Sequence, residues 1–438
     1  MKNLTSLITK KDATIGVIGL GYVGLPLAIQ FLNKGFNVIG YDVDNTKVGL
    51  LEKGESYISH IESSQIMSFV SKDKFKATSD ESIIGKMDCI LICVPTPIDE
   101  HRVPDLSSVL STTKTISKNM SSNTLICLES STYPQTTSKE LKPILDQSGF
   151  AVGKDYFLCY SPEREDPGNK KFSLDQIPKV LGSDDSESLK HGKLLYESII
   201  NSVHIVNSTA TAEAVKLTEN IFRAVNISLS NELKMIFKEM DIDVWDVIDA
   251  AATKPFGFMP FYPGPGVGGH CIPIDPFYLT YKAKEYGMPT RFIELAGEYN
   301  NIALDYIVNS ILMAINKFSK KSISESKILL LGLAYKKNID DMRESPSMFV
   351  YERLLKLGAN VLYNDEFIPV IPKTREHPKL EGQRSLPLDE KTISGFDACV
   401  VLTDHDYFDK NLIIENSKLV LDTRNHFKDF NSSKLHKI

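Results

Sequence analysis

The sequence predicts an α/β protein in which two doubly wound sheet domains are joined by a central helical domain. Residues 14–42 run as strand, glycine turn, helix and strand and end on an acid, and a similar order restarts after residue 326. Between these segments, residues 211–240 carry apolar side chains at helical spacing. A chain of 438 residues is long enough for two or three domains. The expected domains span residues 1–207, 208–317 and 318–438.

Composition and charge limit the kinds of partner. The chain holds 50 Lys and Arg against 56 Asp and Glu, and its net charge of -6 argues against nucleic acid as the main partner. The first residues, "MKNLTSLITKKDAT", lack the apolar core of a signal peptide, and no later run approaches the roughly 18 apolar residues of a membrane-spanning helix. We therefore expect a cytoplasmic protein, without membrane contact, that acts on a small molecule.

The first glycine turn is typical of a dinucleotide site. In "VIGLGYVGLPLA", Gly19 permits a tight turn, Gly21 lets a pyrophosphate approach the backbone, and Gly24 lets the following helix pack on the strand. Asp42 ends the second strand, where its carboxylate can accept hydrogen bonds from the adenosine ribose and would repel a 2′-phosphate. Residues 1–207 are therefore predicted to form a Rossmann domain that binds NAD. Tyr22 and Val23 are expected to contact the cofactor from the same turn.

Later strands of this domain end in polar residues. "MDCILICVPTP", "NTLICLESST" and "YFLCYSPERED" are each predicted to form a strand. Open parallel sheets bind ligands at the carboxyl ends of their strands. We therefore expect Thr96, Ser131 and Thr132 to line the cofactor cleft, and Glu163 and Arg164 to reach the same edge.

One side of the predicted helix at residues 211–240 is polar. Glu213, Lys216, Asn220 and Arg223 follow one another at spacings of three and four, which places them on one face. Such a face is often only a solvent-facing surface, and composition alone favours that interpretation. A second long helix at about residues 290–316 is expected to pair with the first in a layer suited to dimer contacts.

The stretch "GPGVGGHCIPIDP" at residues 264–276 places four glycines and three prolines around one cysteine, Cys271. Glycine and proline disfavour regular helix and strand, so we expect Cys271 to need backbone close by. His270 has no other ligands at metal-binding spacing, so we predict a loop hydrogen bond for it and no metal site. The remaining cysteines lie in or beside apolar runs and are expected to be buried hydrophobes: Cys89, Cys93, Cys127, Cys159 and Cys399.

The carboxyl-terminal part repeats the order of strand, glycine turn, helix, strand and acid in "SKILLLGLAYKKNIDDMRESPSMFVYERLLKLGANVLYND". This repeat lacks GxGxxG, so a second nucleotide-type sheet without dinucleotide chemistry is predicted. Strands at "FDACVVLTDH" and "KLVLDTRN" would complete it. Residues 367–390 are polar and punctuated by proline, and we expect an ordered surface excursion there.

Six motifs together resemble the UDP-glucose/GDP-mannose dehydrogenases over nearly the full chain: "GLGYVGLPLA", "STYPQTT", "SPEREDPGN", "EAVKLTEN", "GPGVGGHCIPIDP" and "GLAYKKNIDDMRESPS". The segments "KPFGFMPFYPGPGVGGHCIPIDPFYL" and "REHPKLEGQRS" are most similar to the branch that oxidises UDP-N-acetylglucosamine. The resemblance implies that the C6 alcohol of the sugar is oxidised to the acid with two NAD and without release of the aldehyde. It also implies a homodimer through the central helices and a product used for capsule or O-antigen synthesis.

The resemblance also assigns roles to individual residues. Cys271 resembles the nucleophile that forms a thiohemiacetal and then a thioester, and Lys216 and Asn220 resemble the pair that stabilises oxyanions at O6. Asp275 resembles an acid that works with an ordered water, and Glu163 and Thr132 resemble residues that position water for thioester hydrolysis. The neighbouring Glu165 has no assigned role. The residues expected to bind the nucleotide sugar are Glu163, Arg164, Lys216, Asn220, Gly268, Lys336, Lys337 and Arg343, with Arg424 as a weaker candidate.

Other substrates and other classes stay open at this point. UDP-glucose, UDP-N-acetylgalactosamine and UDP-N-acetylmannosamine are the alternative substrates. The UDP-glucose enzymes commonly carry an arginine shortly before the cysteine loop, whereas this chain has "TKPFGFMPFYP", which favours a pocket for a bulkier C2 substituent. Dehydrogenases of the 2-hydroxyacid or 6-phosphogluconate type, which oxidise once, and a non-catalytic NAD or nucleotide sensor are the alternatives of another class.

Overall fold

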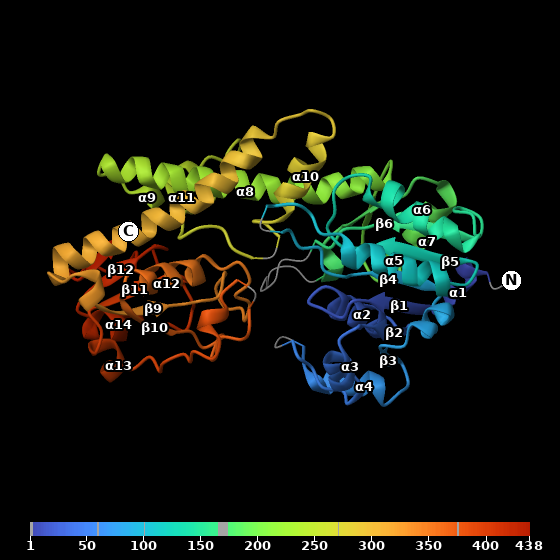
Figure 1. Cartoon of the computed structure of the whole chain (residues 1–438), viewed down its shortest axis with the longest axis horizontal. Coiled ribbons are helices and arrows are strands. Elements are labelled where there is room, and N and C mark those ends of the chain that lie inside the picture. Colours follow the sequence, from blue (N-terminus) through green and yellow to red (C-terminus); the bar gives the residue numbers. More distant parts are fainter. Residues whose placement is uncertain (1–2, 59–60, 100, 165–173, 270, 375) are drawn as a thin grey trace. The chain divides into compact units, whose positions relative to one another are not determined.

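The computed structural model describes residues 3–58, 61–99, 101–164, 174–269, 271–374 and 376–438. The chain forms two compact units (Figure 1). Unit 1 holds the chain up to residue 219 together with residues 277–288, and unit 2 holds residues 220–276 and 289–438. Each unit has its own sheet. Two positions singled out in the sequence, Glu165 and His270, lie outside the described residues.

Unit 1 is built on an eight-stranded sheet with the order β3-β2-β1-β4-β5-β6-β7-β8. Its first six strands have the order of a dinucleotide-binding fold, which reverses direction between β1 and β4. β6 and β7 pair antiparallel, and the other neighbours pair parallel. The strands are β1 Thr14–Ile18, β2 Asn37–Tyr41, β3 Phe75–Thr78, β4 Cys89–Ile92, β5 Thr124–Leu128, β6 Tyr156–Tyr160, β7 Lys179–Gly182 and β8 Val203–Val206.

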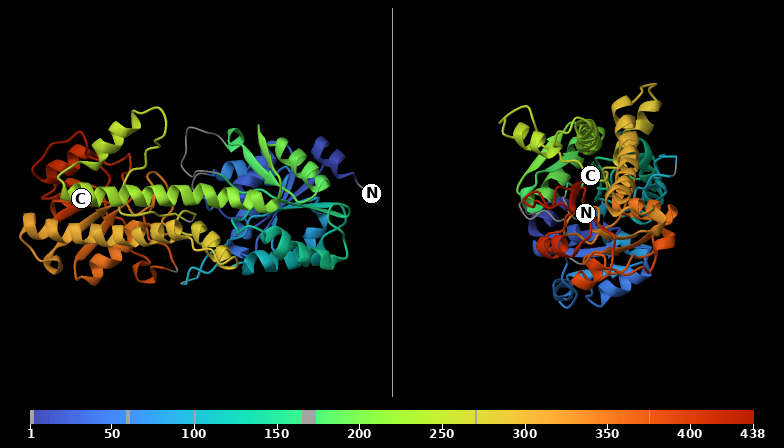
Figure 2. Two further views of the ribbon diagram at one scale, coloured as in Figure 1. Left: turned by 90° about the horizontal axis from the view of Figure 1, so that it is seen from above. Right: turned by 90° about the vertical axis from the view of Figure 1, so that its left-hand side faces the viewer.

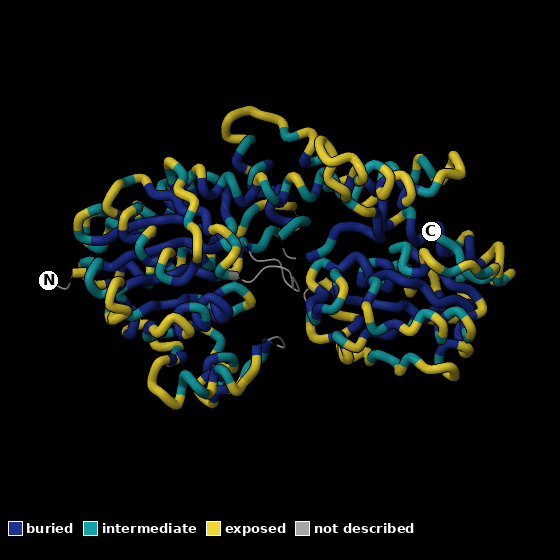
Figure 3. Tube along the Cα trace, turned by 180° about the vertical axis from the view of Figure 1, so that it is seen from behind, coloured by how far each residue is buried: buried dark blue, intermediate teal, exposed yellow. Residues whose placement is uncertain are grey.

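Both faces of this sheet are apolar because helices cover both of them. Leu91 and Cys127 belong to the core cluster on one face, which α1, α2 and α7 cover, and Ile92 and Leu128 belong to the cluster on the other face, under α5 and α6. Figure 3 shows the buried strands and the exposed outer sides of the helices. The helices are α1 Leu4–Lys10, α2 Gly24–Asn33, α3 Asn45–Glu52, α4 Ser63–Val70, α5 Ser107–Asn119, α6 Lys142–Leu145 and α7 Ser186–Glu197.

The strand register brings the carboxyl ends of five strands together. Ile18 of β1 pairs with Tyr41 of β2 and with Ile92 of β4. Ile92 pairs with Leu128 of β5, which in turn pairs with Tyr160 of β6. The segments that follow these residues therefore lie along one edge of the sheet, where ligands of open parallel sheets bind.

Unit 2 holds a five-stranded parallel sheet with the order β10-β9-β11-β12-β13. In β9, Ile328 and Leu330 pack with α11 and α12, whereas Leu329 and Leu331 pack with α13 and α14. The strands are β9 Lys327–Leu331, β10 Asn360–Asn364, β11 Ala398–Val401, β12 Val420–Asp422 and β13 Leu435–Lys437. The helices are α11 Arg291–Ala314, α12 Pro346–Lys356, α13 Glu390–Ser394 and α14 Lys410–Asn416.

The acid that follows β10 is bound within unit 2. Asp365 Oδ2 accepts hydrogen bonds from the amides of Leu333 at 2.7 Å and Ala334 at 3.0 Å, and lies 3.1 Å from His405 Nε2. Burial alone would raise the pKa of Asp365, but its hydrogen bond to His405, the charge of His405 and the two amides hold that pKa below its ordinary value. These contacts tie Asp365 to protein groups at the position where a dinucleotide fold carries its ribose-binding acid.

The long helix α8 (Thr209–Glu239) begins in unit 1 and continues in unit 2, where α9 (Val244–Ala252) follows it (Figure 2). Within unit 2, α8 packs beside α11. Ser228 Oγ donates to the Ala296 carbonyl at 2.9 Å, and the Tyr299 hydroxyl donates to Glu232 Oε1 at 2.6 Å. The predicted pairing of two long helices is therefore confirmed. Helix α10 spans Asp275–Lys284.

Several short elements were not predicted, among them α1, α9, β3, β7, β8 and β13. Each spans 3 to 9 residues, which is too short for a clear periodic signal. Residues 367–390, apart from residue 375, form the expected ordered excursion: the Ile371 amide donates to the Gln383 carbonyl at 2.9 Å, and the Ser385 amide donates to the Pro369 carbonyl at 3.0 Å. None of the described helices combines the length and apolar content needed to cross a membrane.

Candidate active site

The glycine turn after β1 fits a bound dinucleotide. Gly19 adopts a φ of 89°, and a Cβ there would lie 2.7 Å from the Cys93 carbonyl oxygen, so the position requires glycine. A Cβ on Gly24 would collide with the Gly19 carbonyl oxygen, which explains how α2 can start so close to β1. A Cβ on Gly21 would meet nothing within 4 Å. The backbone at Gly21 therefore faces open space that a pyrophosphate can enter.

Asp42, directly after β2, is tied to the same turn. Its Oδ2 accepts a hydrogen bond from the Leu20 amide at 2.8 Å, and its Oδ1 accepts one from the Asp44 amide at 2.9 Å. A carboxylate offers about four acceptor sites, so these bonds leave it able to accept ribose hydroxyls. Tyr22, in the turn itself, is 39% exposed. The residues present therefore fit NAD, as predicted.

The segments after β4 and β5 supply the predicted polar residues. Thr96 is buried, and its carbonyl accepts a hydrogen bond from the Tyr278 hydroxyl at 2.9 Å. Ser131 is half-buried. Thr132 is fully buried, and its Oγ1 has no hydrogen-bond partner among the described residues. A buried hydroxyl of this kind requires a water or a ligand.

Glu163, which follows β6, pairs with Lys216 of α8. Lys216 Nζ donates to the Glu163 carbonyl oxygen at 2.6 Å and lies 3.5 Å from Glu163 Oε2. Glu163 Oε1 has no hydrogen-bond partner in the part of the chain that the structure describes. Burial raises the pKa of the Glu163 carboxyl above its ordinary value, and the charges of Lys216 and Lys179 oppose that rise. A carboxyl with a raised pKa is suited to accept and return a proton.

An ion pair that the sequence analysis missed lies beside Glu163. The side chains of Glu129 and Lys179 form a close ion pair and are 0% and 8% exposed. Lys179 Nζ also donates to the Pro162 carbonyl at 3.3 Å, and the Tyr196 hydroxyl donates to Glu129. The pair therefore holds the backbone directly before Glu163. No sequence motif contains both residues, because they are 50 residues apart. The available signal was their position at strand ends: Glu129 directly follows β5, and Lys179 is the first residue of β7.

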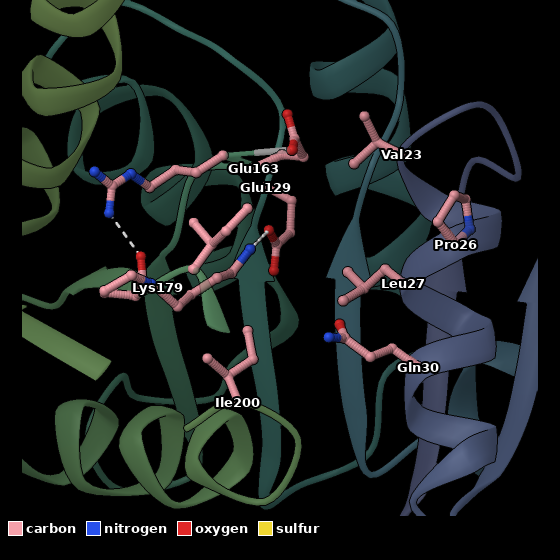
Figure 4. A pocket seen from close by; sticks show the side chains of 11 residues that line it. Val23, Pro26, Leu27, Gln30, Glu129, Glu163, Lys179 and Ile200 are labelled. Carbon is pink, nitrogen blue, oxygen red and sulfur yellow. Dashed lines mark hydrogen bonds and ion pairs between the residues drawn. The ribbon is translucent and has the colours of Figure 1, made fainter. Parts of the chain in front are cut away.

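A cavity in unit 1 opens between this pair and α2 (Figure 4). Arg164 lies beside Glu163 on its wall, where its Nη2 pairs with Glu219 Oε1 at 2.6 Å and its Nη1 donates to the Pro178 carbonyl at 2.6 Å. The predicted cofactor residue Val23 belongs to the opposite wall. The lining residues are Val23, Pro26, Leu27, Gln30, Glu129, Glu163, Arg164, Ile177, Pro178, Lys179 and Ile200.

The polar face of α8, which we call the polar stripe, consists of Glu213, Lys216, Asn220 and Arg223. Glu213 Oε1 accepts hydrogen bonds from the Thr137 amide at 2.8 Å and from Thr137 Oγ1 at 2.7 Å, and Oε2 accepts from the Gln135 amide at 2.6 Å. Burial raises the pKa of Glu213 to about 7 although these hydrogen bonds lower it. The alternative interpretation of this face as a solvent-facing surface is wrong, because every member of the polar stripe bonds to another side chain or to backbone.

In unit 2, three predicted catalytic residues lie close together. Asn220 Nδ2 donates to Asp275 Oδ2, and Arg223 donates to Asn220 Oδ1. The Asp275 amide donates to the Cys271 carbonyl at 2.8 Å, so Cys271 lies one turn before the start of α10. Cys271, Asp275 and Asn220 therefore form one group in unit 2. Glu163 and Lys216 form another contact pair in unit 1, and Lys216 and Asn220 lie one turn apart on α8.

The glycines before Cys271 are required by close packing. A Cβ on Gly268 would lie 2.6 Å from Pro346 Cδ and 2.8 Å from Tyr335 Cβ. The amide of Val267 donates to Asn300 Oδ1 at 2.6 Å, which anchors the segment to α11. Close packing against Pro346 and Tyr335 therefore accounts for the glycine at position 268, and the expectation that Cys271 needs backbone close by stays a prediction.

The other predicted substrate residues lie in unit 2 and contact neighbouring protein groups. Arg343 Nη2 pairs with Asp341 at 2.6 Å, and its carbonyl accepts a hydrogen bond from the Gly269 amide at 3.2 Å. Lys337 pairs with Asp406 at 2.8 Å, and Lys336 is half-buried. Arg424 Nε donates to the Leu402 carbonyl at 2.9 Å, and its guanidinium lies against Gly264. Arg343 and Arg424 are thus placed directly against the cysteine loop.

Cys271 differs from the other cysteines in its exposure to solvent. Cys271 is partly exposed, whereas the other five are buried, as expected. Burial raises the pKa of each of those five thiols, to about 11 for Cys399. Among the described residues, no group of three or more His, Cys, Asp or Glu side chains is arranged to hold a metal ion.

The Rossmann turn and its acid define a protein that binds NAD. Three domains of the UDP-glucose/GDP-mannose dehydrogenase family match the chain: the NAD binding domain at residues 13–200, the central domain at 210–302 and the UDP binding domain at 329–429. The chain belongs to this family. It is therefore an NAD-dependent nucleotide-sugar 6-dehydrogenase whose substrate carries UDP.

Individual relatives agree with this assignment. The chain is 37% identical to Protein CapL of Staphylococcus aureus, over 81% of this chain and 82% of that protein. It is 33% identical to the UDP-N-acetyl-D-glucosamine 6-dehydrogenase of Pseudomonas aeruginosa, over 93% of each chain. The solved structure of the UDP-N-acetyl-D-mannosamine dehydrogenase of Pyrococcus horikoshii is similar with a TM-score of 0.85 and 30% identity, and the match covers 97% of this chain and 99% of that one.

The Lys216 contact predicts how the Glu163 carboxyl responds to a mutation. Lys216→Met removes a cation that favours the carboxylate, so the pKa of Glu163 should rise further. Carbon NMR of labelled glutamate carboxyls would measure it, with Glu163→Gln to assign the resonance. Lys142→Met, which removes a partly exposed lysine of unit 1 paired with Asp146, is the matched control. An unchanged or lowered pKa in Lys216→Met would show that this ion pair does not control the carboxyl.

Proposed function

We propose that this enzyme oxidises the C6 hydroxymethyl group of a UDP-N-acetylhexosamine, UDP-N-acetylglucosamine foremost, to the carboxylate in two steps. The observation that carries the proposal is the group of Cys271, Asp275 and Asn220, because Asn220 donates to the Asp275 carboxylate and Cys271 lies one turn before Asp275. An enzyme that oxidises an alcohol only once has no use for the cysteine, and a sensor has no use for the group as a whole.

The first step removes the hydroxyl proton from O6 and a hydride from C6 to give the aldehyde. Bound NAD supplies the hydride acceptor. Asp275 accepts the hydroxyl proton through a water, and Lys216 and Asn220 donate hydrogen bonds to the developing O6 anion. The hydrogen bond between Asn220 and Asp275 supports this role, because it orients the amide and the carboxylate relative to each other.

The second step uses the thiol. The Cys271 thiolate adds to the aldehyde carbon to give the anion of a thiohemiacetal, and loss of a hydride from C6 to the hydride acceptor then leaves a thioester. Water then attacks the thioester carbon, which releases the acid and the thiol. We assign the positioning of this water to Glu163 and Thr132. Glu163 Oε1 and Thr132 Oγ1 have no hydrogen-bond partner among the described residues, which supports the assignment because buried polar atoms of this kind bind water.

The choice of an N-acetylated sugar has two supports. The relatives from Pseudomonas aeruginosa and Pyrococcus horikoshii are named for UDP-N-acetyl-D-glucosamine and UDP-N-acetyl-D-mannosamine. In the segment before the cysteine loop, Phe256, Phe258 and Met259 are 70%, 43% and 61% exposed, so apolar surface is available to contact an acetyl group. UDP-N-acetylmannosamine is the second candidate substrate, because the relative from Pyrococcus horikoshii is named for it.

Substrate preference follows from this proposal. The kcat/KM for UDP-N-acetylglucosamine should exceed that for UDP-glucose by about tenfold or more, which corresponds to about 1.4 kcal/mol of contact with the acetyl group. The measurement is initial NADH formation with four UDP-sugars, including those of N-acetylmannosamine and N-acetylgalactosamine. Phe256→Ala should reduce the preference for the acetylated sugars, with Tyr286→Ala as an exposed aromatic control. Equal or higher kcat/KM for UDP-glucose would refute the choice of substrate.

We further propose a homodimer formed through the central helices. Phe222, Leu229 and Ile236 recur every seven residues on α8 and are 47%, 48% and 42% exposed. On α11, Phe292 and Leu295 are 78% and 48% exposed. A helix with an exposed apolar stripe at this spacing is typical of helix pairing between subunits.

Leu229→Glu should weaken the dimer by about tenfold or more, because association would bury an unpaired carboxylate. Sedimentation velocity over a range of concentrations measures the dissociation constant. Ser111→Glu adds the same charge to an exposed position of α5 and should leave the dimer unchanged. A monomeric parent protein, or equal effects of both variants, would exclude this interface.

We also propose that the chain divides into three domains, with boundaries at residues 207 and 317. The same proposal includes a cellular role. The UDP-uronate product would serve the synthesis of a capsule or O-antigen, which the similarity to Protein CapL supports. NAD and UDP-sugars are cytoplasmic metabolites, and this supports a cytoplasmic location. Cell fractionation followed by immunodetection would test the location, and recovery in the periplasmic fraction would refute it.

A further inference from the structure

A second cavity lies in unit 2, far from the glycine turn in sequence. It has a volume of about 210 Å³ and is lined by the end of α8, the turn into α9, Tyr306 of α11 and the last residues of the chain. Three lysines line it, Lys234, Lys238 and Lys437, and so does Trp245. A space of this size holds several water molecules or a small organic anion.

Lys234 is the unusual member of this lining. It is 5% exposed, and its Nζ has no hydrogen-bond partner among the described residues. The Nζ atom lies 5.4 Å from the centre of the Trp245 ring. Burial lowers the pKa of Lys234 to about 7, the charges of Arg424 and Lys238 lower it further, and Asp422 opposes them. An ammonium buried without a hydrogen-bond partner is costly, so an anion in this cavity would stabilise the charged form of Lys234.

The two aspartates of the lining do not provide that anion. Asp243 pairs with Lys437 and accepts a hydrogen bond from the Trp245 amide at 2.9 Å. Asp241 lies on the exposed turn between α8 and α9. The indole Nε1 of Trp245 is a second buried donor without a hydrogen-bond partner in the described chain. Two buried donors, one of them cationic, therefore border the same cavity.

We propose that this cavity binds a small oxyanion, a carboxylate or phosphate group, through Lys234, Lys238 and the indole of Trp245. The anion accepts hydrogen bonds from both buried donors and stabilises the charged form of Lys234. Lys234 lies 14 residues after Asn220 on α8, which corresponds to about 21 Å along the helix axis. The proposed anion site is therefore separate from the group of Cys271, Asp275 and Asn220, and it does not depend on the proposed substrate.

Trp245 provides a direct test because it is the one tryptophan of the chain. Its fluorescence would be titrated in the full-length protein with sodium phosphate, with sodium malonate and with sodium chloride at matched ionic strength. Phosphate or malonate should give a saturable change that chloride does not give. Lys234→Met should weaken that binding by about tenfold or more, because it removes a charged hydrogen bond. Lys356→Met, at an exposed position of α12, should leave the binding unchanged.

Saturation with phosphate alone identifies a phosphate site, saturation with malonate alone identifies a carboxylate site, and saturation with both supports the shared chemistry. Lys234→Met should be at least as stable as the parent protein without anions, because the unpaired charge is gone, and thermal unfolding checks this. Lys238→Met, at the exposed end of α8, provides a second variant that should weaken binding several-fold. No saturable change with either anion, an equal response to chloride, or unchanged affinity in both lysine variants would overturn the proposal.

Discussion

The polar stripe of helix α8 is the feature on which the candidate site depends. Each of three members holds a segment that is distant in sequence: Glu213 holds the turn at residues 135–137, Lys216 holds Glu163, and Asn220 holds Asp275. Hydrogen bonds to charged groups contribute about 1.5 to 3 kcal/mol each. In unit 1, Glu213 and Lys216 therefore fix two loop segments against α8, and in unit 2 Asn220 fixes a third, so the loops themselves need little regular structure.

Burial then determines which of these groups are reactive. The carboxyl of Glu163 has a raised pKa because of burial, with Lys216 and Lys179 limiting the rise, and this suits proton transfer. Burial also keeps five thiols protonated and unreactive, whereas Cys271 is partly exposed in a loop that its glycines allow to pack closely. The same physical effect thus prepares one group for chemistry and excludes others from it.

Much of the fold could be predicted because its signals are local. The glycine turn, the strand ends and the long helices each follow from a pattern within about 30 residues. The contacts of the polar stripe with other protein segments could not be predicted in that way, since a polar face has the same spacing whether it contacts water or protein. The Glu129 and Lys179 pair was missed for a related reason: its members lie at β5 and β7, the two strands that flank β6 in the sheet, but they are 50 residues apart in the chain. The burial of Lys234 without a hydrogen-bond partner in the described part of the chain could not be predicted either, because the sequence of α8 does not distinguish it from the other two lysines of that helix.

The measurement that tests the account most directly is the number of NADH molecules formed per UDP-N-acetylglucosamine consumed, in the parent protein and in Cys271→Ser. The account predicts two NADH per sugar in the parent and loss of the second oxidation in the variant, because the variant lacks the thiol that forms the thioester. One NADH per sugar in the parent, or two in Cys271→Ser, would contradict the assignment of Cys271 as the nucleophile.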